Sequence, residues 1–276
     1  MTSTFEQEVK HGDRFRFGEN WQRFLSVLND ERIGEAEKSL KQMLEIEDLH
    51  GKSFIDIGSG SGLFSLAARR LGAKVHSFDY DTQSVACTQE LKQRYFPDDS
   101  NWTIEQGSAL DTDYVKSLGQ FDIVYSWGVL HHTGAMWKAL ENASLLVANK
   151  GLLFIAIYND QGGKSKRWLR VKELYCSGIF GKTVVSSLFI PYWILGGLAV
   201  DVLKGKNPVT RYSEYKKSRG MSRVHDWFDW LGGLPFEVAK PEEIFNFYHV
   251  RRLELKKMTT CGGRLGCNQF VFIQGT

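Results

Sequence analysis

The chain has 276 residues, with 35 Lys and Arg against 32 Asp and Glu, and a formal net charge of +3. This length allows a full α/β core and one appendage. Four scattered cysteines exclude a disulfide framework, and their spacing leads us to expect no metal site. The first thirty residues are charged throughout and lack an apolar signal core, so we expect a cytoplasmic location.

Strand and helix patterns alternate over residues 52–158. Before them, residues 20–29 and 35–46 predict a pair of helices. The predicted strands are 52–58, 73–79, 101–107, 121–127 and 151–158, and the predicted helices are 62–71, 82–96 (capped by Asp81 or Thr82) and 136–147. After a long interval, a helix over 241–250 and strands over 251–258 and 267–274 follow. We therefore predict an α/β fold, a doubly wound, mostly parallel seven-stranded sheet with an antiparallel C-terminal edge and a helical cap insertion.

Three glycines on alternate positions, Gly58, Gly60 and Gly62, follow the first predicted strand. Glycines at a strand-to-helix turn let the backbone approach a ligand closely. Leu63 stands where a dinucleotide fingerprint needs its third glycine, so a pyrophosphate is the weaker interpretation. The acid Asp56 before the loop would repel a diphosphate and suits a ligand with an ammonium group.

A second acid, Asp79, ends the next predicted strand, where its carboxylate can accept hydrogen bonds from both hydroxyls of a ribose. Its neighbour Tyr80 would offer its ring to a base. The third and fourth strands end at Ser108-Ala109 and Ser126-Trp127. All these strand ends meet at the carboxyl edge of the sheet, where open α/β folds bind ligands.

The motifs "DIGSGSG", "FDYD", "GSALD", "FDIVYSWGVLHH" and "GLLFIAIY" resemble, in order and spacing, those of class I S-adenosylmethionine-dependent methyltransferases. The resemblance implies a Rossmann-like methyltransferase fold that binds S-adenosylmethionine. It implies contacts of the methionyl part with Asp56, Gly58, Ser59, Gly60 and Gly62, of the ribose and base with Asp79, Tyr80, Ser108 and Ala109, and of the sulfonium end with Ser126 and Trp127. The family often has an acid at the place of Ser108, so the adenine amino group needs another partner.

The resemblance divides the chain into four segments. Residues 1–50 form an N-terminal helical segment, 51–160 the S-adenosylmethionine-binding core, 161–235 the cap, and 236–276 the helix and strands that complete the sheet. Residues 161–223 hold thirteen Lys and Arg against three Asp and Glu, which suits a solvated face, an anionic substrate or a membrane surface.

Within the cap, residues 183–200 carry no charge and are long enough to span a bilayer. Spanning would separate the last strands from the sheet, and Pro191 and Gly196-Gly197 predict breaks into shorter pieces. We therefore expect an amphipathic or buried helical cap with peripheral membrane contact as one option. The segment "DWFDW", Asp226 to Trp230, has the composition of a pocket, or of a hydrophobic hinge.

Methyl transfer from a sulfonium needs a base only when the acceptor is protonated, and the candidate bases are His225, His132 and Tyr158. The fourth motif lacks the sequences that methylate nucleobases and is similar to the small-molecule branch, so we do not expect a nucleic-acid acceptor. The predicted function is methylation of an oxygen or nitrogen of a small, anionic or lipid- or sugar-linked acceptor. The alternatives are a nicotinamide-dependent oxidoreductase and a non-catalytic S-adenosylmethionine-binding regulator; the sequence leaves the acceptor and the oligomeric state open.

Overall fold

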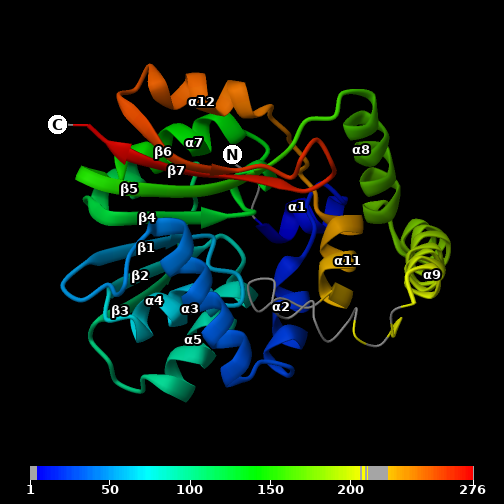
Figure 1. Ribbon diagram of the computed structural model, residues 1–276, viewed down its shortest axis with the longest axis horizontal. Helices are drawn as coiled ribbons and strands as arrows, with labels where there is room; N and C mark the ends of the chain where they lie inside the picture. Colours follow the sequence, from blue (N-terminus) through cyan, green and yellow to red (C-terminus); the bar gives the residue numbers. More distant parts are fainter. Residues whose placement is uncertain (1–4, 206, 209, 211–222, 276) are drawn as a thin grey trace.

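The computed structural model of the protein describes residues 5–205, 207, 208, 210 and 223–275 (Figure 1). Its strands are β1 (Ser53–Ile57), β2 (Lys74–Asp79), β3 (Trp102–Gln106), β4 (Phe121–Trp127), β5 (Val147–Tyr158), β6 (Leu253–Thr259) and β7 (Cys267–Gln274). Its α-helices are α1 (Phe5–His11), α2 (Phe17–Leu25), α3 (Asp30–Leu44), α4 (Leu63–Arg70), α5 (Thr82–Tyr95), α6 (Thr112–Ser117), α7 (Met136–Leu145), α8 (Gly163–Cys176), α9 (Ile179–Leu203), α11 (Arg223–Gly232) and α12 (Pro241–His249), with a 3₁₀ turn η1 (Leu130–His132).

The strands form one seven-stranded sheet in the order β3-β2-β1-β4-β5-β7-β6. The first five strands pair in parallel, and β7 pairs antiparallel with both β5 and β6. The predicted sheet, with its antiparallel C-terminal edge, is confirmed. Asp81 caps α5 by accepting a hydrogen bond from the amide of Gln83, which decides between the two predicted caps.

Helices cover both faces of the sheet and enclose two cores. On one face, Ile33 and Leu40 of α3 pack with α4, α5 and sheet residues such as Phe54. On the other, α6, α7 and α12 pack against residues such as Ile55 and Ile57. Neighbours Phe54 and Ile55 enter different cores because successive side chains of a strand point to opposite faces.

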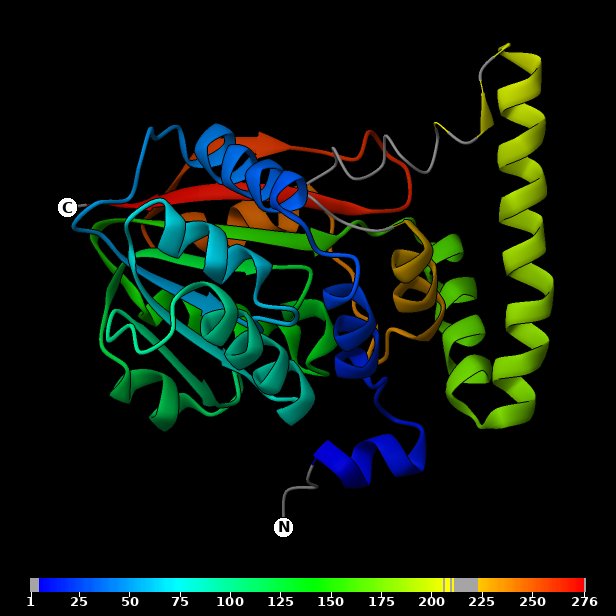
Figure 2. The same ribbon diagram turned by 90° about the horizontal axis from the view of Figure 1, so that it is seen from below.

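The N-terminal helices lie in two different places. Helix α3 packs on the sheet face beside α4, whereas α1 and α2 lie near the carboxyl ends of the strands (Figures 1 and 2). The amide of Gly18, at the start of α2, donates to Asp81 Oδ2 at 2.8 Å. This bond ties α2 to the end of β2, next to the position of Asp79.

The apolar cap segment is one continuous helix, so the predicted breaks at Pro191 and Gly196-Gly197 are wrong. Helix α9 runs for 25 residues with Pro191 inside it. Neither glycine adopts a positive φ, and Gly197 is buried. Packing along the helix therefore outweighs the local cost of proline and glycine in a helix interior. Of the two expected forms of this segment, amphipathic or buried, the buried one is wrong, because only 11% of its apolar window is buried.

Candidate active site

A cavity of about 1190 Å³ lies at the carboxyl ends of β1, β2, β4 and β5. Open α/β sheets bind ligands at this edge. Its volume exceeds the roughly 300–1,000 Å³ of typical small-molecule sites, so there is room for two molecules side by side. Nine of the predicted cofactor residues line it, namely Asp56, Gly58, Ser59, Gly60, Asp79, Tyr80, Ser108, Ala109 and Trp127.

The glycine loop closes tightly over the end of β2. Gly58 and Gly60 have φ values of 75° and 55°, a left-handed conformation that glycine adopts without strain. The amides of Gly58 and Ser59 both donate to the Phe78 carbonyl, at 2.8 and 3.1 Å. Gly62 caps α4, and Thr88 packs where its side chain would be, so it lies outside the cavity lining.

The Asp79 carboxylate joins this loop to the chain that follows β2. Its Oδ2 accepts from the Gly60 amide and its Oδ1 from the Asp81 amide, each at 2.9 Å. A carboxylate has about four acceptor sites, so each oxygen keeps capacity for another donor. Desolvation raises the pKa of Asp79 to about 6, despite the two backbone hydrogen bonds. A pair of ribose hydroxyls fits the remaining acceptor sites.

Asp56 is held by a chain of buried hydroxyls. Ser65 Oγ donates to Asp56 Oδ2 at 2.6 Å, and Ser77 Oγ donates to Ser65 Oγ at 2.8 Å. The indole of Trp102 donates to Ser77 Oγ at 2.9 Å. Asp56 is only 2% exposed and lines the cavity, so this network fixes a carboxylate beside the glycine loop, where an ammonium group would be stabilised.

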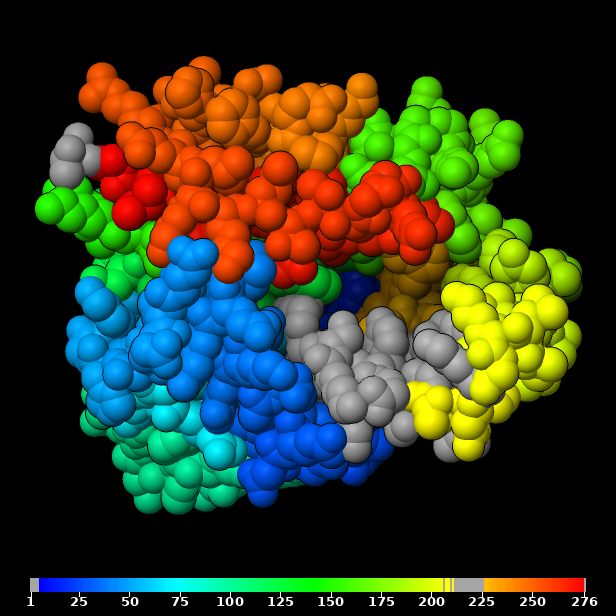
Figure 3. Space-filling view, in the orientation of Figure 1, coloured from blue at the N-terminus to red at the C-terminus, as the bar shows by residue number. Residues whose placement is uncertain are grey.

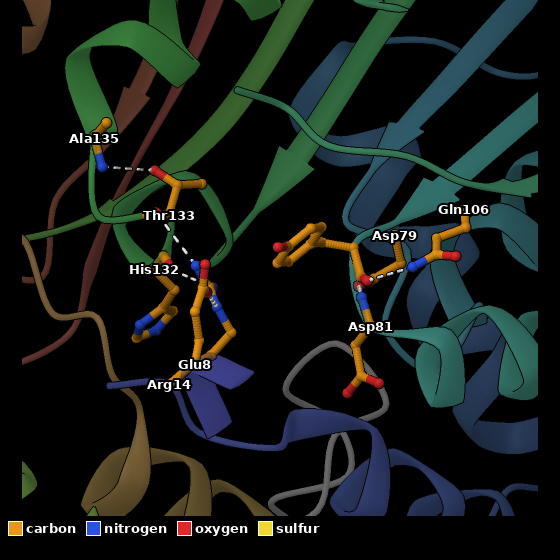
Figure 4. Close-up of polar contacts among 9 residues, drawn as sticks. Glu8, Arg14, Asp79, Asp81, Gln106, His132, Thr133 and Ala135 are labelled. Atoms are coloured by element: carbon orange, nitrogen blue, oxygen red, sulfur yellow. Dashed lines mark hydrogen bonds and ion pairs between the residues drawn. The ribbon is translucent and has the colours of Figure 1, made fainter. Parts of the chain in front are cut away.

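Arg14, between α1 and α2, closes one side of the cavity. Its guanidinium pairs with Glu8 Oε2 at 2.5 Å and donates to the His132 carbonyl at 2.9 Å. It also lies over the Tyr80 ring, 5.2 Å from the centroid. Figure 4 shows Arg14 beside His132 and Thr133, with Asp79 and Asp81 across the intervening space. The N-terminal segment thus connects the chain after β2 with the chain after β4.

The residues that follow β3 line the cavity, whereas only one of the two predicted residues at the end of β4 does. Ser108 and Ala109 line it, as does Asp111, which caps α6. Trp127 lines the cavity, and its indole donates to Gln269 at 3.1 Å. Ser126 is fully buried outside the lining and donates to the Ile57 carbonyl at 2.9 Å. Its side chain joins β4 to β1 and does not reach the predicted sulfonium end.

Two of the three candidate bases line the cavity. His132 and Tyr158 line the cavity, with ring centroids 5.3 Å apart. The Pro235 carbonyl lies 2.6 Å from His132 Nδ1, so this nitrogen carries the proton and Nε2 is the acceptor. Burial, and then the charge of Lys172, lower the pKa of His132 to about 3. His225 belongs to α11, but its side chain lies outside the described residues.

The far end of the cavity is aromatic. Trp168 lies 5.3 Å from Trp230 and 6.4 Å from Trp193, and Trp193 lies 5.7 Å from Trp227. All four indoles line the cavity; we call them the tryptophan wall. The "DWFDW" segment therefore forms pocket, as predicted, while Trp168 and Trp193 come from α8 and α9.

Two carboxylates of α11, Asp226 and Asp229, line the same end. The Asn20 amide donates to Asp229 Oδ1 at 2.9 Å. Burial, and then the charge of Asp226, raise the pKa of Asp229 well above its usual value. Lys172 lies close by, fully buried, with its ammonium 4.8 Å from the Trp230 ring and its pKa lowered to about 7 by desolvation.

Sequence reasoning missed several lining residues. Asp111 stood in a quoted motif without a role, and its cap position could have marked it. Arg14 and Trp21 precede the first strand, and Trp168 and Trp193 lie in the cap. No local pattern marks them, since tertiary packing alone brings them to the sheet edge.

Residues 55–153 match a family model described as "Methyltransferase domain". A ribosomal protein L11 methyltransferase of Prochlorococcus marinus (strain MIT 9515) is 40% identical over 140 residues, which cover 50% of this chain and 46% of that protein. The chain spans less than half the length of the curated relatives that it matches.

Solved methyltransferases share the fold at low sequence identity. Magnesium protoporphyrin IX methyltransferase of Synechocystis PCC 6803, with bound S-adenosylhomocysteine, has a TM-score of 0.51 and 13% identity, over 100% of this chain and 90% of that one. The N-methyltransferase NodS of Bradyrhizobium japonicum WM9, in complex with S-adenosylhomocysteine, has a TM-score of 0.51 and 13% identity, over 95% and 100%.

Proposed function

Because the chain carries a class I S-adenosylmethionine-dependent methyltransferase domain, an enzyme domain whose cofactor is S-adenosylmethionine, we propose that it methylates an oxygen or nitrogen of a small acceptor. The observation that carries this proposal is that one cavity contains both the glycine loop with Asp79 and the tryptophan wall. A cofactor at one end and an acceptor at the other would then meet at the position of Trp127 and Tyr158.

The bound cofactor would supply an electrophilic methyl group. The chain's own residues then have to hold the two reactants in line, which accounts for most of the rate of such a displacement. Asp79 and Asp56 orient the cofactor end, and each is itself fixed by hydrogen bonds to the protein. The tryptophan wall packs against the body of the acceptor and excludes water.

Asp229 is the proton acceptor in this proposal. It lines the cavity from α11, whose next residue, Trp230, lies with its ring centroid 5.1 Å from that of Tyr158. Burial raises the pKa of Asp229 well above its usual value, which is the direction that makes a carboxylate a better general base. The pKa of His132 is moved the other way, to about 3. We assign His132 the role of a neutral hydrogen-bond acceptor that orients the acceptor's N–H or O–H. The ring of Tyr158 packs against the ring of His131, with centroids 3.9 Å apart, and this contact supports the orientation of the neighbouring His132.

The cavity lining favours a neutral or cationic reacting group on an apolar body. Among the described lining residues, Arg14 and Lys138 are the basic ones, whereas acids are more numerous (Glu8, Asp56, Asp79, Asp81, Asp111, Asp226 and Asp229). The exposed basic residues of the cap, such as Lys166 and Arg167, lie on the surface of α8. The anionic character predicted for the acceptor therefore has less support than the lipid- or sugar-linked body.

The alternatives predict other binding preferences. A nicotinamide-dependent oxidoreductase would bind NADH, and a regulator would bind S-adenosylmethionine without turnover. The L11 methyltransferases resemble only part of this chain, and a protein acceptor is the outcome that they would suggest. The cytoplasmic location remains a prediction.

The test is label transfer. The protein is incubated with methyl-deuterated S-adenosylmethionine and separated soluble, lipid and protein fractions of a cell extract, and the products are analysed by mass spectrometry. We expect a labelled product in the small-molecule or lipid fraction, and at least tenfold less of it with Asp79→Asn at a limiting cofactor concentration. Label in the protein fraction alone would contradict the proposed acceptor class, and S-adenosylmethionine binding without label in any fraction would favour the regulator.

A further inference from the structure

Helix α9 presents an apolar surface that no described part of the chain covers. Ten of its large hydrophobic residues are exposed, including Phe180 at 81% and Tyr192 at 68%. Soluble monomers rarely expose contiguous apolar patches of such size unless the patch binds something. In both ribbon views α9 stands at the edge of the molecule, and its surface forms an outer rim in the space-filling view (Figures 1–3).

One narrow stripe of α9 faces the protein. The residues at intervals of four from Gly181 to Asp201 (Gly181, Val185, Phe189, Trp193, Gly197, Asp201) are buried or half-buried. Trp193 packs on Trp168 of α8 and Trp227 of α11, and Gly181 lies so close to α8 that a side chain there would collide with the Leu174 carbonyl. Through the contacts from Gly181 to Trp193 this stripe fixes α9 to α8 and α11, and most of the remaining circumference of the helix faces outward.

The exposed charges of α8 and α9 are mostly basic. In the described parts of α8, α9 and their connections, the exposed charged residues are Lys164, Lys166, Arg167, Arg170, Lys182 and Lys204, with Glu173 as the exposed acid. Asp201 is buried at 4% exposure, so its carboxylate does not offset them on the surface. An apolar helix with basic neighbours is complementary to lipids with anionic headgroups.

The helix is long and apolar enough to cross a bilayer, with a mean hydropathy of 1.7. Its buried stripe contradicts crossing, because α8 and its charged side chains would then enter the hydrocarbon together with α9. A second copy of the chain is a poorer partner than lipid, because a two-fold contact through α9 would bring equal basic clusters together. We propose that α9 lies along the surface of an anionic bilayer, with Leu188, Leu195 and their neighbours among the lipids.

This arrangement gives the cavity a lipid-facing wall. Trp193 lines the cavity from α9, while its neighbours Tyr192 and Ile194, about 100° around the helix to either side, are exposed. On the proposed function, an acceptor with a lipid-soluble body would pass from the bilayer to the tryptophan wall without crossing water. Lipid docking itself does not depend on methyl transfer.

The test is flotation of the full chain with phosphatidylcholine vesicles that contain or lack phosphatidylglycerol. We expect binding to the anionic vesicles, reduced by added salt. The double variant Leu188→Glu/Leu195→Glu should bind at least tenfold more weakly, while Val250→Glu, an equally exposed position on the C-cap of α12, should bind like wild type. Lys166→Gln/Arg167→Gln should lose about fivefold per residue on anionic vesicles.

Melting temperature and S-adenosylhomocysteine affinity verify that each variant is folded. Wild-type protein that binds neither vesicle, or a double variant that binds like wild type, overturns lipid docking. So does sedimentation that shows a wild-type dimer broken by the double variant, without vesicle binding. Vesicle binding without any methylated product would instead refute the proposed function and leave α9 as a lipid-binding helix.

Discussion

The amide of Gly60 donates a hydrogen bond of 2.9 Å to the carboxylate of Asp79. This contact joins the loop after β1 to the end of β2, so the two residues that would hold opposite parts of the cofactor are fixed relative to each other. The bond also positions a carboxylate in surroundings poor in water, where its pKa rises to about 6. The cofactor half of the site is therefore organised before any ligand binds.

The raised pKa predicts how cofactor affinity changes with pH. Ribose hydroxyls donate to the ionised carboxylate, and Asp79 of the unliganded protein is ionised only above about pH 6. Affinity for S-adenosylhomocysteine should be constant from pH 7 upward and fall by up to about tenfold per unit as the pH drops below 6. Calorimetry across this range measures it. Asp79→Asn should show no such dependence; an identical slope in that variant would assign the titration to another group.

The same shift predicts the opposite trend for the unliganded fold. A carboxyl whose pKa is higher in the folded than in the unfolded state stabilises the fold most at low pH. The contribution of Asp79 should be lost as the pH rises from about 4 to 6. Chemical denaturation of wild type and Asp79→Asn should show their difference in unfolding free energy changing over this range and levelling above it. A difference that is the same at pH 4 and pH 7 would contradict the shift.

Gly18 predicts a stability difference within the N-terminal segment. A Cβ there would lie 2.6 Å from Asp81 Oδ2 and 2.5 Å from the Gln83 Cβ, so Gly18→Ala has to move α2 away from the start of α5. We expect a loss of about 1–3 kcal/mol. The control is Gly34→Ala inside α3, where nothing lies within 4 Å of a Cβ, and which should gain about 0.5–1 kcal/mol. Urea denaturation midpoints test both the expected loss for Gly18→Ala and the expected gain for Gly34→Ala. Equal changes in unfolding free energy for the two variants would refute the close contact at Gly18.

Turnover measurements distinguish the roles of Asp229 and Asp226, the two acids of α11. Once label transfer has identified an acceptor, Asp229→Asn should lower kcat by about 10²–10⁴-fold, because a general base is lost, with cofactor affinity unchanged. Wild-type kcat should rise with pH as Asp229 ionises, because its pKa is raised. Asp226→Asn, on the same helix and in the same lining, is the matched control and should keep most of its turnover. If both variants lost kcat equally, Asp229 would not be the general base and would contribute only to the charge of the cavity.

The His132→Gln variant tests the orienting role. Glutamine can still accept one hydrogen bond, so we expect a loss of about tenfold in kcat. No titration of His132 should appear near pH 6.5, because its pKa lies at about 3. A pH profile of turnover that loses a step near 6.5 in His132→Gln would make this histidine the base instead.

The alternation of strands and helices was predictable because period-2 and helical patterns are local. The glycine loop and Asp79 were predictable for the same reason, since each sits at a strand end. Ser126 shows the limit of this reasoning. Successive strand side chains point to opposite faces, so Ser126 and Trp127 could not both face the cavity, and Ser126 bonds to Ile57 instead.

The closed side of the cavity could not be predicted. Arg14 reaches the His132 carbonyl 118 residues further along the chain, and no spacing in the sequence reports such a contact. The prediction of breaks within α9 was wrong for another reason. Proline and glycine predict local breaks, but Val185 and Trp193, on either side of Pro191, pack against α8 and α11 and hold the helix in one piece. In both cases tertiary contacts override local preference.

The central claim is that the glycine loop and Asp79 hold S-adenosylmethionine. Its most direct measurement is calorimetric titration of the wild type and Asp79→Asn, at pH 7.5, with S-adenosylhomocysteine and with NADH. The exposed loop variant Asp98→Asn is the control for removing a charge. We expect one S-adenosylhomocysteine per wild-type chain, binding at least tenfold weaker in Asp79→Asn because charge-assisted hydrogen bonds are lost, and no binding of NADH. Wild-type affinity in a folded Asp79→Asn protein, or tighter binding of NADH than of S-adenosylhomocysteine, would contradict the claim.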